Sequence, residues 1–205
     1  NGHSVDVAPG IQQWSEASGI WRADYDQAAE RTGSFGDRRA VVDAGANEQL
    51  VNSEIKWDGG RAGIVFNYQN ESNWGMFWYD GVADLVVAKV AGGLFKEMGR
   101  TNFAWKEGKK HDMAVEVIGA TATAYLDKDA LFTFDITELV DGTEAGLFVR
   151  TVAPRTYDNF ALFADATQPA PPTVPMTTIV EDTFSDVDGT PLESHTPDTA
   201  PDGSS

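Results

Sequence analysis

The C-terminal stretch 179–205, which reads IVEDTFSDVDGTPLESHTPDTAPDGSS, decides how the rest of the chain is interpreted. Its first residues are typical of a β-strand, and it contains the phrase HTPDTAP at 195–201. A similar phrase, HSVDVAP, stands at 3–9 and shares its His, Asp, Ala and Pro. The repetition predicts that the C-terminal segment resembles the opening of a unit that the chain has already entered at its N-terminus. The alternative is a chance match between two polar loops that contain proline.

The composition predicts one globular domain followed by a tail. The chain has 205 residues, of which 41% are hydrophobic and 11% aromatic, enough for a substantial core. Its formal net charge of −17 argues against nucleic-acid binding, which requires a basic surface. It contains no cysteine, so disulfides and thiolate metal sites are excluded. No apolar stretch approaches the roughly 20 residues of a membrane helix, so we expect no membrane insertion.

Short runs rich in Val, Ile, Phe and Trp, separated by glycines and by the turn dipeptides Asp-Gly, predict an all-β fold. So many strands in so short a chain predict two antiparallel sheets packed face to face. The only helical turn that we expect lies around 24–30. The expected strands are 39–43, 49–56, 61–68, 74–79, 85–90, 93–98, 111–118, 121–126, 130–135, 145–149 and 156–163.

Three segments follow from these patterns. Residues 1–164 form the predicted sandwich, residues 165–176 form a linker with four prolines, and residues 177–205 form a strand-containing tail. If the tail is equivalent to the start of the next repeat, the sandwich 1–164 lacks its own first strand.

Several motifs resemble those of laminin-G-like, concanavalin-A-like jelly-roll modules from bacterial extracellular and phage proteins. They are RAGIVF at 61–66 with ESNW at 71–74, VEVIG at 115–119 with AYLD at 124–127, AGL at 145–147 with YDNF at 157–160, and DTF at 182–184 with HTPD at 195–198. The last pair opens such modules but here lies behind the domain. The resemblance implies a two-sheet antiparallel jelly roll, a fold that hosts lectins, glycosidases, adhesion modules and spacers.

A sandwich without its first strand exposes unpaired backbone groups, each costing about 1–3 kcal/mol if buried. The tail is the natural strand to fill the gap. It can complete its own sandwich, insert into a neighbouring copy as a donor strand, or belong to the next repeat of a longer chain. The predicted assembly strand contains Thr178, Ile179, Val180, Asp182 and Phe184.

These patterns favour an extracellular, non-catalytic structural or adhesive building block whose partners are copies of itself arranged head to tail in a filament or repeat array. The alternative is a lectin-like carbohydrate-binding module of a surface protein or viral fibre, whose partners are glycans. Glycosidases of this fold class place paired carboxylates along one strand, and the sequence contains no such run, so we do not expect an enzyme.

Carbohydrate binding requires an exposed aromatic platform beside polar groups. The candidates are Trp74, Trp78, Tyr79, Asp80 and, second, Trp57. Strand alternation places Trp74 and Trp78 on one face and Tyr79 on the other. Because both faces carry aromatic residues, packing in the core remains the alternative for each of them.

Calcium is the one cofactor that the sequence suggests. Asp186 and Asp188 alternate before Gly189, as in part of an oxygen-ligand loop. Asp158 can contribute if the tail lies beside the strand that contains it. A surface turn is the alternative, because the remaining ligands of such a loop are missing.

Overall fold

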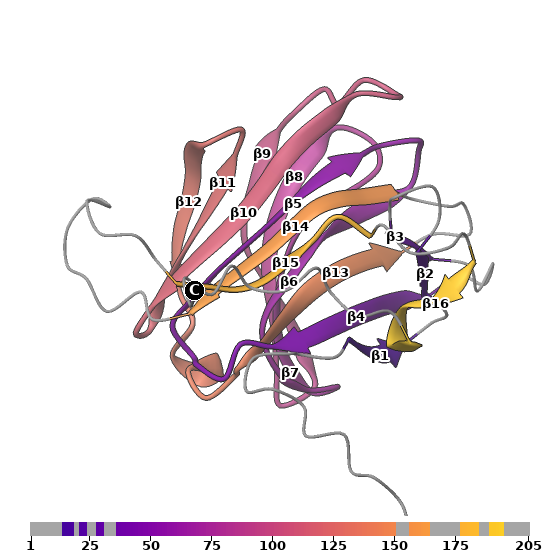
Figure 1. Ribbon diagram of the computed structural model, residues 1–205. Helices are drawn as coiled ribbons and strands as arrows, with labels where there is room; N and C mark the ends of the chain where they lie inside the picture. The colour runs from indigo at the N-terminus through magenta and orange to yellow at the C-terminus, as the bar shows by residue number, and fades with distance from the viewer. Residues whose placement is uncertain are drawn as a thin grey trace, which may run out of the picture.

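The computed structural model describes residues 14–18, 21–23, 28–30, 36–150, 156–164, 177–184 and 189–194. These residues form two antiparallel sheets that pack face to face, with two 3₁₀ turns at Thr137–Leu139 and Leu192–Ser194 (Figure 1). The predicted all-β jelly-roll sandwich is confirmed. In the described part of the chain, no helix is long and apolar enough to span a membrane.

One sheet has seven strands in the order β1-β4-β13-β6-β7-β8-β9. Each pair of neighbours is antiparallel, and β9 forms one edge of the sheet. The strands are β1 (Ser15–Ser18), β4 (Asp37–Asp43), β13 (Glu144–Arg150), β6 (Arg61–Asn70), β7 (Asn73–Tyr79), β8 (Asp84–Ala91) and β9 (Leu94–Asn102).

The other sheet has nine strands, with β12-β11-β10-β5-β14-β3-β2-β16 in order and β15 also paired with β14. The short strands β2, β3 and β16 gather with β1 at the right-hand end of Figure 1. The strands are β12 (Asp129–Asp135), β11 (Thr121–Leu126), β10 (Lys110–Ile118), β5 (Gln49–Lys56), β14 (Thr156–Ala164), β15 (Thr177–Asp182), β3 (Ala28–Glu30), β2 (Trp21–Ala23) and β16 (Thr190–Pro191).

The core lies between the sheets and follows from strand alternation. In β5, every second residue from Gln49 to Ile55 is buried, and β10 buries Met113, Val115 and Val117 in the same way. Rings from opposite sheets meet in this layer, for example Phe66 and Phe134 at a centroid distance of 5.9 Å. Each fully buried side chain of this size contributes about 1.5–3 kcal/mol relative to an exposed one.

The seven-stranded sheet also buries apolar side chains on its outer face, which points away from the core. This second cluster explains why β6, β7 and β8 are buried on both faces although only one face meets the other sheet. Its members are Val41, Val65, Tyr68, Trp74, Met76, Trp78, Val86, Ala88 and Phe148.

The prediction of a helical turn around 24–30 is wrong for residues 28–30, the part of that range that the structure describes, because these residues form the strand β3. The strand β3 pairs with β2 on one side and with β14 on the other. Nearby, the ring of Trp21 is fully buried and lies 5.8 Å from Tyr157 of β14. Tertiary contacts therefore decide the backbone here, because three-residue strands have no recognisable period of their own.

The described tail packs against its own domain. The strand β15 pairs antiparallel with β14 of the same chain, with Phe160 opposite Asp182 and Leu162 opposite Val180. Of the three arrangements that the sequence allows, this is the one in which the tail completes its own sandwich. Strand donation to a neighbour, and with it a head-to-tail filament, has no support in the structure.

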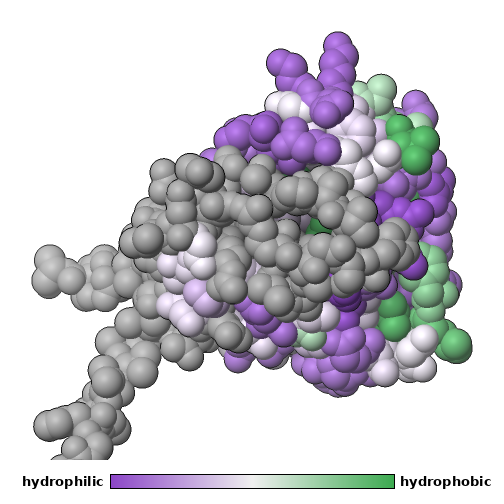
Figure 2. Space-filling model, turned by 90° about the vertical axis from the view of Figure 1, so that its right-hand side faces the viewer, coloured by the Kyte–Doolittle hydropathy of each residue, from purple (hydrophilic) through white to green (hydrophobic). Residues whose placement is uncertain are grey.

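Figure 2 shows the side of the molecule on which the short strands lie. Its described surface is mainly hydrophilic, and apolar residues form small, separate groups. This agrees with the 32 acidic and 15 basic residues of the chain.

Candidate functional site

A cavity of about 770 Å³ lies on the outer face of the seven-stranded sheet, over the second apolar cluster. The register of the strands brings the lining residues of this cavity together, because residues that are paired across neighbouring strands lie side by side on one face. A central row crosses six strands and contains Arg39, Phe148, Gly63, Trp78, Val86 and Arg100. An adjacent row contains Val41, Gly146, Val65, Met76, Ala88 and Glu97. The middle of each row is therefore apolar. The first of the two rows has an arginine at each end, Arg39 on β4 and Arg100 on β9.

The floor of the pocket is apolar. Trp78 packs edge-on against Phe148 at 6.1 Å and against Phe95 at 6.2 Å. Gly63 permits this layer, because a Cβ at that position would lie 2.1 Å from the backbone oxygen of Phe77 and 2.6 Å from the Cβ of Trp78. The close approach of β6 and β7 at this one register position therefore requires a glycine.

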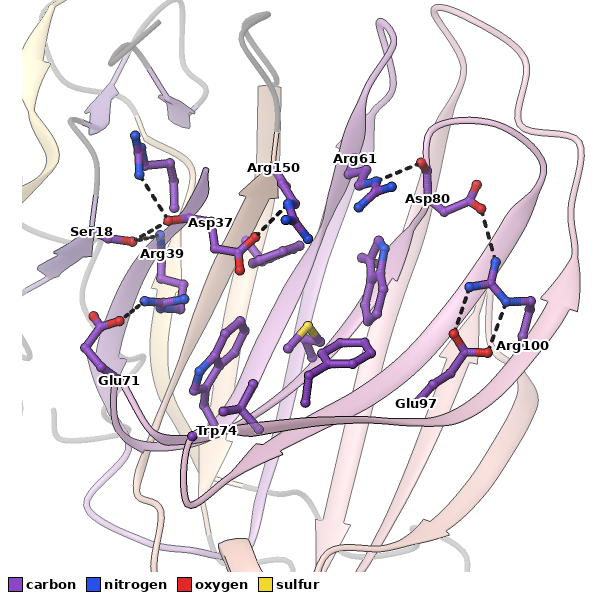
Figure 3. Close-up of a pocket in the computed structure, with 17 residues that line it drawn as sticks. Ser18, Asp37, Arg39, Arg61, Glu71, Trp74, Asp80, Glu97, Arg100 and Arg150 are labelled. Atoms are coloured by element: carbon purple, nitrogen blue, oxygen red, sulfur yellow. Dashed lines mark hydrogen bonds and ion pairs between the residues drawn. The ribbon is translucent and has the colours of Figure 1, made fainter. Parts of the chain in front are cut away.

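Charged side chains surround this floor on three sides (Figure 3). At one end, the guanidinium of Arg39 lies 4.3 Å from the centre of the Trp74 ring and forms an ion pair with Glu71. Glu71 also accepts a hydrogen bond from Tyr68. Burial and the charge of Glu71 raise the pKa of Tyr68 above its ordinary value. The aromatic face of Trp74 is thus covered by a fixed cation.

At the opposite end, Arg100 donates two hydrogen bonds to Glu97, at 3.1 and 2.8 Å, and one to Asp80 at 3.1 Å. The other oxygen of Asp80 accepts the backbone N–H groups of Val82, Ala83 and Asp84. Burial alone raises the pKa of Asp80, but these backbone hydrogen bonds and Arg100 outweigh it and lower the pKa below its ordinary value. Asp80 therefore stays ionised and fixes both its own turn and Arg100.

A third charged group borders the pocket between these two ends. Arg150 lies opposite Asp37 on one neighbouring strand and opposite Arg61 on the other. It forms an ion pair with Asp37 at 3.3 Å, whereas Arg61 donates from Nε to the backbone oxygen of Asp80 at 3.3 Å. Ser18 of β1 holds this edge together, because it donates to the backbone oxygen of Asp37 and accepts the N–H of Arg39.

The structure separates the carbohydrate candidates that the sequence suggested. Trp74, Trp78 and Asp80 line the pocket. Tyr79 does not, because it points into the core, where it is 1% exposed. Trp57 also packs against the core, edge-on to Tyr79 at 5.0 Å, and its Nε1 donates to Gly60. Tyr79 therefore offers no platform to a ligand, which corrects that assignment, whereas Trp57 is half-buried and lies outside the pocket.

The most exposed aromatic ring of the pocket was not among the candidates that the sequence suggested. Phe95 is 58% exposed, whereas Trp74 and Trp78 expose 2% and 7%. Phe95 belongs to the edge strand β9, which has a neighbour on one side only. The signal in the sequence was the spacing of Phe95 and Glu97, two residues apart and therefore on one face of a strand.

The calcium hypothesis falls largely outside the described residues, because Asp186 and Asp188 lie there. The third candidate, Asp158, accepts a hydrogen bond from Lys110 at 3.1 Å and one from its neighbour's backbone N–H. Within the described ranges no cluster of three or more His, Asp or Glu is arranged to hold a metal ion.

Comparison with known proteins is informative at the level of the fold. No protein-family model and no curated protein matches this chain. Among solved structures, the carbohydrate-binding module CBM66 from Bacillus subtilis has a TM-score of 0.64 at 19% identity, over 74% of this chain and 96% of that one. The xylan β-1,4-xylosidase from Bacillus halodurans C-125 has a TM-score of 0.54 at 16% identity, over 66% of this chain but 32% of that one. The protein BlXynB from Bacillus licheniformis has a TM-score of 0.55 at 16% identity, over 68% and 33%. The chain therefore has the jelly-roll sandwich fold that its sequence motifs resemble.

Proposed function

We propose that this protein is a non-catalytic carbohydrate-binding module whose ligand occupies the pocket on the seven-stranded sheet. The observation that carries the proposal is the pocket itself, in which an apolar, aromatic floor is surrounded by fixed charged groups. A sugar ring has apolar C–H faces and polar hydroxyl edges, so it needs both kinds of surface at once. Pockets of this volume and mixed character are the usual sites of small ligands.

The ion pairs around the floor suit hydroxyl recognition. A hydroxyl both donates and accepts, so it can donate to a carboxylate and accept from the neighbouring guanidinium. Arg100 with Glu97, and Arg39 with Glu71, place such a donor and acceptor side by side at opposite ends. Because the partners hold each other in place, little side-chain entropy is lost when a ligand binds.

Phe95 is the ring that we expect to contact the sugar face. It stands at the pocket wall beside Trp78 and is largely exposed. Trp74 has a supporting role, because Arg39 already covers its ring. An aromatic contact of this kind is worth about 0.5–1.5 kcal/mol beyond the area that it buries.

The fold likeness to CBM66 supports the proposal, because that protein is named a carbohydrate-binding module and almost its whole length is matched. We also propose that this chain acts outside the cell, where it would encounter polysaccharides.

Adjacent residues of β9 provide a matched test. Leu94 and Phe95 are both apolar and exposed, at 77% and 58%, but only Phe95 lines the pocket. We expect the protein to bind at least one glycan on an array of plant, microbial and animal glycans. Phe95→Ala should weaken the binding about tenfold, which is about 1.4 kcal/mol, and Leu94→Ala should leave it unchanged. The absence of binding to every glycan, or equal losses for the two variants, would refute the proposal.

A further inference from the structure

The pocket differs in charge from the rest of the molecule. The chain carries 15 basic and 32 acidic residues, yet five of its eight arginines line this one cavity, beside four carboxylates. The arginines are Arg38, Arg39, Arg61, Arg100 and Arg150. Positive charge is therefore concentrated where the protein as a whole has little of it.

Two of these arginines are direct cross-strand neighbours. Arg150 of β13 lies opposite Arg61 of β6 on the outer face of the sheet. Like charges in this relation destabilise a sheet, by up to about 1 kcal/mol. Asp37 lies on the far side of Arg150 and pairs with it. The structure thus maintains two adjacent cations at the pocket border although the arrangement costs stability.

Arg61 has no ion-pair partner among the described residues, and its one hydrogen bond goes to a backbone oxygen of Asp80. The carboxylates that line the pocket are engaged elsewhere. Glu71 pairs with Arg39, and Glu97 pairs with Arg100. Asp80 accepts three backbone N–H groups and Arg100. No lining carboxylate in the described part of the chain is therefore left to neutralise Arg61.

Two further donors at the site support the same conclusion. Arg39 Nε and Trp74 Nε1 are buried donors without an acceptor among the described residues. An unpaired buried donor costs about 1–3 kcal/mol. A ligand rich in oxygen acceptors suits such a wall better than a ligand with many donors.

We propose that the pocket takes a carbohydrate that carries an anionic oxygen group, either a carboxylate or a sulfate, and that Arg61 and Arg150 bind this group. The inference rests on the proposed function and adds the class of sugar to it. A guanidinium presents N–H donors in a planar fork that matches two oxygens of one oxyanion. An oxyanion between the two arginines would also replace their mutual repulsion with attraction.

The test uses the complete chain and matched pairs of probes in isothermal titration. One pair is a tetragalacturonate and its methyl ester, in which methylation removes the negative charges. The other is a sulfated galactan oligosaccharide and its desulfated form. We expect the charged member of at least one pair to bind about tenfold or more tightly than its neutral partner. The pair that shows the difference identifies the anion as carboxylate or sulfate.

Arg61→Gln should remove this preference, so that the charged probe loses about tenfold in affinity and binds no more tightly than its neutral partner. Lys106→Gln removes one charge from an exposed residue outside the pocket, and should preserve the preference. Arg61→Gln should unfold at the same temperature as the wild type or a higher one, which excludes misfolding as the cause of a loss.

The outcomes separate the two proposals. Equal or tighter binding of the neutral probes, or an unchanged preference in Arg61→Gln, would overturn the anionic inference while the carbohydrate-binding function stands. Binding to none of these probes, and to none of the glycans on the array, would overturn the proposed function and the inference with it.

Discussion

The indole Nε1 of Trp14 donates a hydrogen bond of 2.9 Å to the carboxylate of Asp182, which lies 168 residues further along the chain. Both side chains are buried, and Asp182 also accepts the backbone N–H of Phe184. The ring of Trp14 lies 4.8 Å from Phe160 and 6.0 Å from Phe184. The two ends of the described chain are therefore joined in one core.

This contact predicts that the tail stabilises its own domain. Phe184→Ala should lower the free energy of unfolding by about 3–5 kcal/mol, because it empties a fully buried site. Ser194→Ala, at an exposed position nearby in the sequence, is the control. Chemical denaturation measures both changes.

The dependence of the unfolding midpoint on protein concentration tests whether the tail pairs with its own domain. A strand that pairs within its own chain makes the unfolding midpoint independent of protein concentration. A midpoint that rises with concentration would show that the strand is exchanged between copies, as the filament hypothesis required.

Gly63 should tolerate no side chain. A Cβ there would overlap the backbone of β7 at Phe77 and Trp78, so Gly63→Ala should cost about 1–3 kcal/mol. Gly45→Ala is the comparison, because open space surrounds that position and only its positive φ of 68° opposes the change. We expect thermal unfolding to show the larger loss at Gly63, and a near-ultraviolet spectrum to show a changed environment of Trp78. Equal losses would contradict the close-approach argument.

Asp80 should give the stability of the protein a dependence on pH. Its pKa is lowered in the folded state, so its contribution is present above the unfolded value of 3.8 and is lost as the pH falls through the folded value. Asp80→Ala should cost about 1–3 kcal/mol at pH 7, and less below pH 3.8.

Asp84→Ala is the matched control for Asp80, because it removes only an exposed ion pair with Arg100, worth about 0–1 kcal/mol. Urea denaturation at several pH values measures both variants. A difference between Asp80→Ala and the wild type that stays constant from pH 7 to pH 3 would count against this account.

Glu144 should change the pH dependence of stability in the direction opposite to Asp80. Burial and the neighbouring Asp43 raise its pKa, so the folded state favours the protonated carboxyl. Ionisation of Glu144 then reduces stability as the pH rises from the unfolded value of 4.5 through the folded one. Glu144→Gln should therefore raise the urea midpoint at pH 7 and leave it unchanged well below pH 4.5. A lower midpoint at pH 7 would disprove the expectation.

The sequence predicted the strands of the central domain well, and the structure shows why. Within 111–118, Met113, Val115 and Val117 share one face of the predicted strand, and this face is the buried one in the structure. The N-terminal strands β2 and β3 were not predicted, because each contains only three residues and depends on partners far away in the sequence. The strand β3 pairs with β14, and β2 pairs with β16.

Alternation along β7 was enough to place Trp74, Met76 and Trp78 together on one face and Phe77 and Tyr79 on the other, because successive side chains of a strand point to opposite sides. Which of these faces meets the other sheet was undetermined, because both are apolar. Only the tertiary structure decided it, since the register of β4, β13, β6 and β9 brings Arg39, Arg150, Arg61 and Arg100 around the outer face. Strand periodicity is a local property that the sequence carries, whereas register between strands up to about a hundred residues apart is set by packing of the whole sandwich.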